Sequence, residues 1–309
     1  MEFLSDMAVN LFFCISGFLI LASAQRVGLA SYLWRRFLRI FPGYWVSIFF
    51  IILIAVPISY LMGTSKFVWN TSENLKYVVN NFDLYKIQYV IPDTQIGIPW
   101  QAWNGSTWTL WYEFMAYLCL VPLAYIPVVK KYQRLTVTVA FLLSLLIFPF
   151  LVHVDASTNM YWHFARLVPM FLAGSLLYVW GDYIKVRVAP VVLAVTLTVL
   201  VHFIDNVYLV NTLQVLFAYG VLGLAGVLKI YWGYVNDLSY GVYIYAFPVQ
   251  QLLIVGGSAS LGILLNVVLT LAITMCLAYL SWNFVEKPAM GLKKLVPTHR
   301  KRVYSEAVS

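Results

Sequence analysis

Two arginines are the first candidates for chemistry in this sequence. Arg36 and Arg39 lie three residues apart, so on a helical segment they share a face. Each can bind a phosphate through two parallel hydrogen bonds, because the guanidinium is a planar fork of donors. Arginines beside a membrane segment also set its orientation, so a purely topological role is the alternative.

Glu113 is the one acidic residue well inside an apolar run, where an ionised side chain is costly and is usually functional or paired. Trp108 precedes it by five residues, about 7–8 Å along a helix. Arg166 lies a few residues inside another apolar run and is its expected partner. Glu113, Arg166 and Trp108 are the candidate catalytic residues, with Glu113 as general base. A structural ion pair between Glu113 and Arg166 is the alternative.

The composition indicates a membrane protein. Of the 309 residues, 62% are hydrophobic and 10% are charged, whereas soluble domains are about one quarter charged. A soluble monomer this apolar would expose large apolar patches, which such proteins rarely do. The net charge of +8 comes from basic residues scattered between apolar runs, so we expect a lipid bilayer and no nucleic acid as partner.

We predict an all-α, polytopic bundle with about nine transmembrane helices, since a span needs roughly 20 apolar residues. One domain is expected over residues 1–309, with a long outer loop at about 63–106 and a basic cytoplasmic tail at about 287–309. A short helix is expected within the loop, between Glu73 and Phe82. The predicted spans are about 7–25, 43–62, 107–127, 135–152, 163–180, 188–204, 212–228, 240–256 and 261–285.

The distribution of Lys and Arg predicts the orientation of these spans. Alternate loops and the tail hold 16 of the 20 basic residues, so that side is cytoplasmic. The C-terminus is then cytoplasmic, and Glu113 and Arg166 fall in the outer half of their spans. Arg36 and Arg39 fall on the cytoplasmic side, where they can meet a phosphate-bearing ligand.

Six different short motifs lie along the chain. Together they resemble those of the acyltransferase-3 family of membrane O-acyltransferases. Their order is that of the family, and they cover the chain from Phe12 to Pro288. The motifs are Phe12-Phe13-Cys14-Ile15-Ser16-Gly17-Phe18-Leu19-Ile20, the stretch Arg35 to Trp45, Trp108-Thr109-Leu110-Trp111-Tyr112-Glu113, Phe171-Leu172-Ala173-Gly174, Ser239-Tyr240-Gly241-Val242-Tyr243 and Phe284-Val285-Glu286-Lys287-Pro288.

The resemblance implies an enzyme of the bacterial cytoplasmic membrane that transfers an acyl group, usually acetyl, from cytoplasmic acyl-CoA. The implied acceptor is a hydroxyl of an exported glycan or lipid-linked saccharide, as in O-acetylation of surface polysaccharides. Acetyl-CoA is then a donor substrate; no permanently bound cofactor and no metal are expected. Arg35, Arg36, Arg39 and Tyr240 are the candidate donor-binding residues, although interface anchoring explains Tyr240 equally well.

The family has ten helices, and its first helix carries an Arg and, eleven residues on, a His thought to act in transfer. This sequence begins where the second helix is expected, and Asn10 stands where an Asp is common. We therefore expect upstream in-frame sequence that encodes this helix; an inactive or truncated acyltransferase is the alternative. The histidines present match none of the family's His position; they are His153, His163, His202 and His299.

Two other protein classes remain open from the residues themselves. A transporter of a small molecule or glycan could use a buried Glu113 and Arg166 as its substrate or proton site. Transporters of this size often contain an internal repeat, and the Arg35–Trp45 and Trp108–Glu113 motifs have no counterpart in the second half. A structural membrane subunit is the third possibility, and it leaves Glu113 unexplained.

Overall fold

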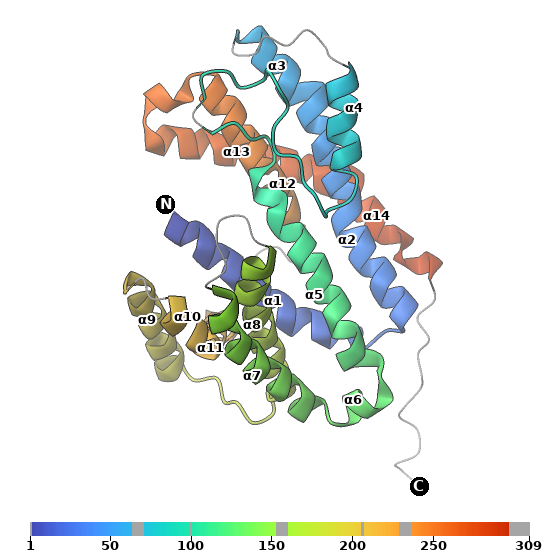
Figure 1. Cartoon of the computed structure of the whole chain (residues 1–309), viewed down its shortest axis with the longest axis vertical. Coiled ribbons are helices and arrows are strands. Elements are labelled where there is room, and N and C mark those ends of the chain that lie inside the picture. Colours follow the sequence, from blue (N-terminus) through green and yellow to red (C-terminus); the bar gives the residue numbers. More distant parts are fainter. Residues whose placement is uncertain are drawn as a thin grey trace. The chain divides into compact units, whose positions relative to one another are not determined.

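The computed structural model describes residues 2–63, 71–98, 100–152, 160–204, 207–228 and 236–296 (Figure 1). In these ranges the chain forms helices and no strand, which confirms the all-α class. Each predicted span coincides with a helix. These helices are α1 (Glu2–Ala24), α2 (Leu29–Phe50), α5 (Trp108–Tyr125), α7 (Gln133–Val152), α8 (Met160–Val179), α9 (Val188–Phe203), α11 (Gln214–Leu228), α12 (Ser239–Val255) and α13 (Ile263–Ser281).

Five helical stretches in the described ranges are long and apolar enough to cross a membrane, which supports an integral membrane protein. Two shorter apolar helices, Val188–Val201 and Gln214–Leu228, accompany them. The total of nine spans therefore stays a prediction. The five stretches are Ser5–Ala24, Leu29–Leu61, Gln133–Phe150, Met160–Val179 and Ile263–Leu295.

The second span begins earlier than its hydropathy suggests. We placed its start at residue 43, after a loop of residues 26–42, but α2 begins at Leu29 and Pro42 lies inside it. It continues through the π-helical turn η1 (Ile51–Ala55) and α3 (Val56–Leu61). Arg36 and Arg39 therefore stand on a helix, which tolerates Pro42 as membrane helices do.

The last span also extends beyond its predicted end. α13 continues through a second π-helical turn, η4 (Trp282–Glu286), then α14 (Lys287–Gly291) and η5 (Leu292–Leu295). The segment predicted as a tail from residue 287 is thus helical as far as Leu295. Residues 297–309 lie outside the described part of the chain.

The long loop contains α4 (Thr71–Asn80), which confirms the short helix predicted there, and the 3-10 turn η2 (Gly105–Thr107). Trp103 lies in the long loop, just before this turn. Its side chain is fully buried, and its indole N–H donates to Oγ1 of Thr94 over 2.9 Å. A buried indole needs such an acceptor.

The chain forms two compact units. Among the described residues, unit 1 is built from residues 2–32 and 112–228, and unit 2 is built from residues 33–111 and 236–296. Unit 1 holds α1, α7, α8, α9, α11 and most of α5, whereas unit 2 holds most of α2, the long loop, α12 and α13. A single domain over residues 1–309 stays a prediction.

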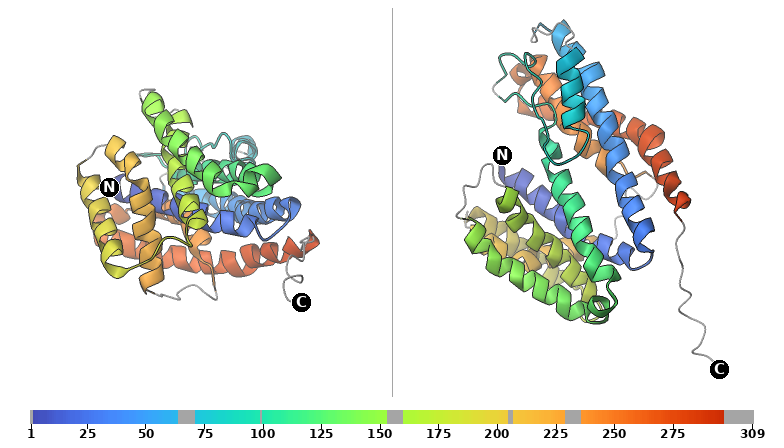
Figure 2. Two further views of the ribbon diagram at one scale, coloured as in Figure 1. Left: turned by 90° about the horizontal axis from the view of Figure 1, so that it is seen from below. Right: turned by 45° about the vertical axis from the view of Figure 1, so that its right-hand side comes forward.

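Two motif glycines set the distance between α1 and α8, which lie side by side in unit 1 (Figure 2). A Cβ on Gly17 would stand 1.8 Å from the backbone oxygen of Phe171, and one on Gly174 would stand 2.0 Å from that of Cys14. The Ser175 hydroxyl donates to the Gly17 carbonyl over 3.0 Å across the same contact. Small residues permit this close approach of membrane helices.

Two further motif glycines allow close packing between helices of unit 2. A Cβ on Gly43 of α2 would stand 2.7 Å from the Tyr240 ring, and one on Gly241 of α12 would stand 2.8 Å from Cα of Ala278. Both positions also face the buried Glu286 side chain, at 3.5 Å and 3.2 Å. The glycines of these motifs therefore bring α2, α12 and the helix after α13 together around one carboxylate.

We expect Gly17→Ala to lower the free energy of unfolding by about 3 kcal/mol or more, because the added methyl meets backbone that cannot repack. The midpoint of thermal unfolding in detergent measures this effect. Gly28→Ala is the matched control: nothing lies within 4 Å of its added Cβ, so its cost should stay under about 1 kcal/mol. Equal losses in both variants would contradict the close-contact interpretation.

Candidate functional site

A pocket of about 500 Å³ in unit 2 carries five cationic side chains. We call it the basic pocket. Asp237, which precedes α12, is the acidic residue among those that line it, so the lining keeps a strong positive excess. The cationic residues are Arg36 and Arg39 of α2, Lys287 of α14, and Lys293 and Lys294 of η5.

Arg39 is held between two carboxylates of different exposure. Its Nη2 lies 2.8 Å from Oδ2 of Asp237, a side chain that is 46% exposed. Its Nη1 lies 3.9 Å from Oε2 of Glu286, which is 3% exposed. The guanidinium also lies 5.6 Å from the centre of the Tyr240 ring, so three groups fix its position.

Glu286 closes the π-helical turn η4 and is buried beneath Arg39. Ser281, five residues earlier, donates from Oγ to Oε1 of Glu286 over 2.9 Å. A π-turn places residues five apart on one face, and such turns occur frequently at functional sites. The buried carboxylate therefore has a fixed hydrogen bond on one oxygen and a cation near the other.

Tyr240 supports the basic pocket from behind. Its hydroxyl donates to the Ile40 carbonyl over 2.5 Å, which joins α12 to α2. It is buried and is not among the pocket-lining residues of the described chain, so it orients Arg39 without facing the cavity. Arg35 is half-buried on α2 and is also outside that lining. Of the four predicted donor-binding residues, the structure places Arg36 and Arg39 in the pocket wall.

Arg166 belongs to a polar cluster of unit 1 on α1 and α8. Its Nη2 lies 2.8 Å from Oδ1 of Asp6 and 3.5 Å from Oδ1 of Asn10, so its ion pair is with α1. The pair expected between Arg166 and Glu113 is replaced by this contact. Asp6 lies one turn before Asn10, on the same face of α1, and the close contact at Gly17 and Gly174 brings that face to α8.

Glu113 lies on α5 and is 5% exposed. The Tyr117 hydroxyl, one turn later on the helix, donates to its Oε1. The preceding residue, Tyr112, packs its ring against His163 of α8, with centroids 5.5 Å apart. Glu113 is therefore a buried carboxylate with a hydroxyl donor, and its neighbour in sequence, Tyr112, contacts the half-buried His163.

Trp108 is the first residue of α5, and the structure describes it as half-buried in unit 2. The next residue, Thr109, shares a hydrogen bond with the Tyr243 hydroxyl of α12. Tyr243 also donates to the Ser106 carbonyl just before α5. These contacts tie the first turn of α5 to α12, so the Trp108–Glu113 and Ser239–Tyr243 motifs meet there.

Sequence reasoning missed Asp6 and Asp237. Asp6 lies one residue before the predicted first span, and its four-residue spacing from Asn10 was the available signal. Asp237 follows a stretch without motif, and only the fold places it beside Arg39. His153 and His299 lie outside the described residues. Within the described ranges, no three His, Cys, Asp or Glu side chains gather as a metal ion would require.

A double-mutant cycle tests which carboxylate pairs with Arg166. Asp6→Asn and Arg166→Gln should show a coupling of about 0.5–1.5 kcal/mol in the free energy of unfolding, because the two side chains touch. Glu113→Gln with Arg166→Gln should be additive within about 0.5 kcal/mol. Coupling confined to the Glu113 cycle would restore the original pairing.

Comparisons with known proteins agree with the family resemblance of the motifs. The family profile described as an acyltransferase domain, that of acyltransferase-3, matches residues 1–283. The chain is similar to an O-acetyl transferase of Shigella phage Sf6, with 27% identity over 316 residues, covering 93% of this chain and 85% of the phage protein. No solved structure matches the chain. Because the family match extends over most of its length, the chain belongs to the acyltransferase-3 family.

Proposed function

We propose that this protein is a membrane O-acyltransferase that binds acyl-CoA, most simply acetyl-CoA, at the basic pocket and transfers the acyl group to a glycan hydroxyl. The observation that carries the proposal is the pair Arg36 and Arg39 in the wall of one cavity of about 500 Å³, which three lysines also line. Coenzyme A carries a diphosphate and a ribose phosphate, which need several cationic donors at once.

The support around Arg39 suits this role. A phosphate site works best when its guanidinium is already oriented, because less freedom is then lost on binding. Glu286 and Tyr240 hold Arg39 from its buried side, whereas Asp237 holds it from the exposed side. The donor phosphate would take the exposed side by replacing the Asp237 carboxylate, while the buried support stays in place.

The proposed reaction is the transfer of an acyl group from sulfur to oxygen. The acceptor oxygen attacks the thioester carbonyl, its bond to carbon forms, and the carbon–sulfur bond breaks. The hydroxyl proton passes to a base, and the coenzyme leaves as a thiolate that takes up a proton. Glu113 is our proposed base, because it is a buried carboxylate that accepts a hydrogen bond from Tyr117.

The phage relative's name, O-acetyl transferase, supports acetyl as the transferred group. The family match favours the acyltransferase interpretation over a transporter. The positive-inside rule would place the basic pocket at the cytoplasmic face of a bacterial inner membrane. The acceptor, an exported glycan or lipid-linked saccharide, would then receive the group from the other side or from within the membrane.

The double variant Arg36→Lys, Arg39→Lys should weaken acetyl-CoA binding by about 1.5–3 kcal/mol, because each lysine keeps the charge and loses the fork. Isothermal titration calorimetry on the purified chain measures the change. Arg26→Lys, in the connection before α2, is the control and should bind as the parent does. Unchanged affinity for acetyl-CoA in the double variant would mean that both arginines only set the orientation of α2 in the membrane.

Glu113→Gln should abolish transfer while donor affinity and the unfolding midpoint stay near those of the parent, because the amide keeps the shape and loses the base. Transfer of labelled acetyl groups to candidate glycans measures activity. Glu73→Gln, in the α4 pair with Lys76, is the control carboxylate. Retained transfer in Glu113→Gln would exclude Glu113 as the base; a lowered midpoint with retained transfer would indicate a structural carboxylate.

A further inference from the structure

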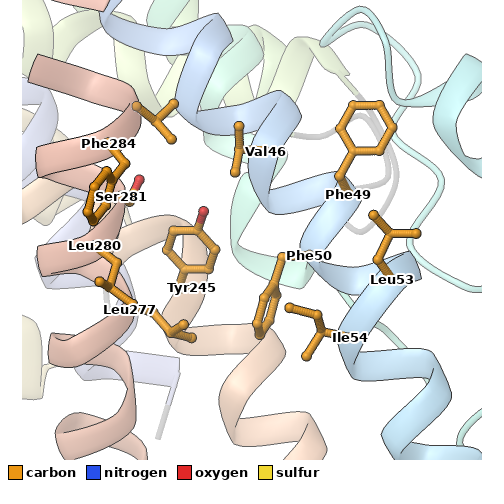
Figure 3. A pocket seen from close by; sticks show the side chains of 11 residues that line it. Val46, Phe49, Phe50, Leu53, Ile54, Tyr245, Leu277, Leu280, Ser281 and Phe284 are labelled. Carbon is orange, nitrogen blue, oxygen red and sulfur yellow. The ribbon is translucent and has the colours of Figure 1, made fainter. Parts of the chain in front are cut away.

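A second cavity of unit 2 lies between α2 and α13, with α12 behind it (Figure 3). We call it the apolar groove. Its volume is about 310 Å³, and Tyr245 and Ser281 contribute the only hydroxyl groups among its described lining residues. Those two side chains are 3% and 4% exposed. The remaining lining is hydrocarbon or aromatic, so the groove suits an apolar ligand.

The rim of the apolar groove is exposed. Leu53 is 58% exposed and Phe284 is 75% exposed, and they belong to the helical stretches Leu29–Leu61 and Ile263–Leu295 that can cross a membrane. Exposed apolar side chains on such helices face lipid hydrocarbon. The groove therefore opens sideways toward the bilayer, where alkyl chains are the available occupants.

The groove has the direction and length of one alkyl chain. On α2 and η1 its lining extends from Val46 to Ile54, and on α13 and η4 from Leu277 to Val285. Each stretch covers eight residue steps, or about 12 Å along the helix. One leaflet of hydrocarbon is about 15 Å deep, since the core measures roughly 30 Å. A chain lying along these helices would have the depth that it has in a leaflet.

The basic pocket follows the apolar groove along the same helical stretch. The apolar groove is lined by Leu277, Leu280 and Phe284 of this stretch. Lys287, three residues after Phe284, and Lys294, seven residues later, line the basic pocket. The π-helical turn η4 lies between these two sets, so they follow one another along the helical stretch without forming a single α-helical stripe. One helical stretch thus presents an apolar segment followed directly by a cationic one.

We propose that the apolar groove and the lysine end of the basic pocket bind one membrane lipid with an anionic phosphate headgroup. Its alkyl chain lies in the groove and its phosphate lies at Lys287, Lys293 and Lys294, whereas the proposed donor phosphates bind Arg36 and Arg39 in the same pocket. Charge complementarity selects the phosphate, and the sideways opening admits the chain.

The geometry favours a lipid over a long-chain acyl-CoA as the occupant of the groove. Lys287 follows Phe284 by three residues, about 5 Å along the helix, and a lipid chain begins a few bonds from its phosphate. In coenzyme A a long polar arm separates the phosphates from the acyl group, so the acyl chain would begin far beyond Phe284. The inference does not rest on acyl transfer, because lipid binding is measured without any donor.

Native mass spectrometry of the full chain tests the proposal, with phosphatidylglycerol and phosphatidylcholine of identical chains added to the detergent-purified protein. Phosphatidylglycerol should be retained in preference. Val46→Trp should fill the groove and lower its retention by about tenfold, since burial of a large part of one chain is lost. Leu271→Trp is the matched control, because Leu271 is an exposed residue of α13 outside the groove; its retention should equal that of the parent.

The headgroup is tested separately. Lys293→Gln with Lys294→Gln should remove the preference for phosphatidylglycerol, whereas Lys130→Gln with Lys131→Gln, in α6 (Pro127–Lys131) of unit 1, should keep it. Equal retention by Val46→Trp and Leu271→Trp would overturn the proposal. Reduced binding of palmitoyl-CoA with unchanged phosphatidylglycerol in Val46→Trp would also overturn it and assign the groove to the donor.

A second filling variant, Leu280→Trp, repeats the test at the other wall in case Val46→Trp lowers the unfolding midpoint. Normal acetyl-CoA binding in a filling variant that has lost the lipid separates this site from the proposed donor site. Loss of the lipid in neither filling variant would overturn the proposal whatever the donor affinity is.

Discussion

Close packing at four glycines is the constraint on which both units depend. Gly17 and Gly174 bring the backbones of α1 and α8 together. Gly43 packs against the Tyr240 ring and Gly241 packs against the Ala278 backbone, both beside Glu286. No methyl group fits at any of the four positions without displacement of a neighbour. Every polar contact described between these helices requires that spacing, because hydrogen bonds fail beyond about 3.5 Å. The glycines of these motifs therefore allow close helix packing, and this packing brings the charged side chains within contact distance.

Much of the architecture followed from composition and periodicity. The all-α class, the positions of the apolar helices and the short helix in the long loop were predictable, because each depends on local pattern. The limits of the second and last helices were not. Hydropathy marks where a helix becomes apolar, whereas helix formation continues into amphipathic sequence, as at Leu29 before Arg36 and at Lys287 after α13.

The candidate site was predictable in part for a related reason. Arg36 and Arg39 share a face because of their spacing, and the structure places both in one pocket wall. The partner of Arg166 was not predictable, because it depends on which helix packs against α8 at Gly174. Glu113 was the partner predicted from depth, whereas packing pairs Arg166 with Asp6. Long-range pairing of charges is a property of the assembled helices, and no local pattern encodes it.

The π-helical turn at Trp282–Glu286 has a consequence for how this sequence can vary. One extra residue in a helical turn rotates everything that follows by about 100°. Removal of a single residue there would leave hydropathy, composition and charge almost unaltered, yet it would turn Lys287 and Lys294 away from Arg39. The number of residues between Ser281 and Lys287 therefore fixes the direction in which the side chains after the turn point. Insertions and deletions in this segment separate two surfaces that the helical stretch keeps in register.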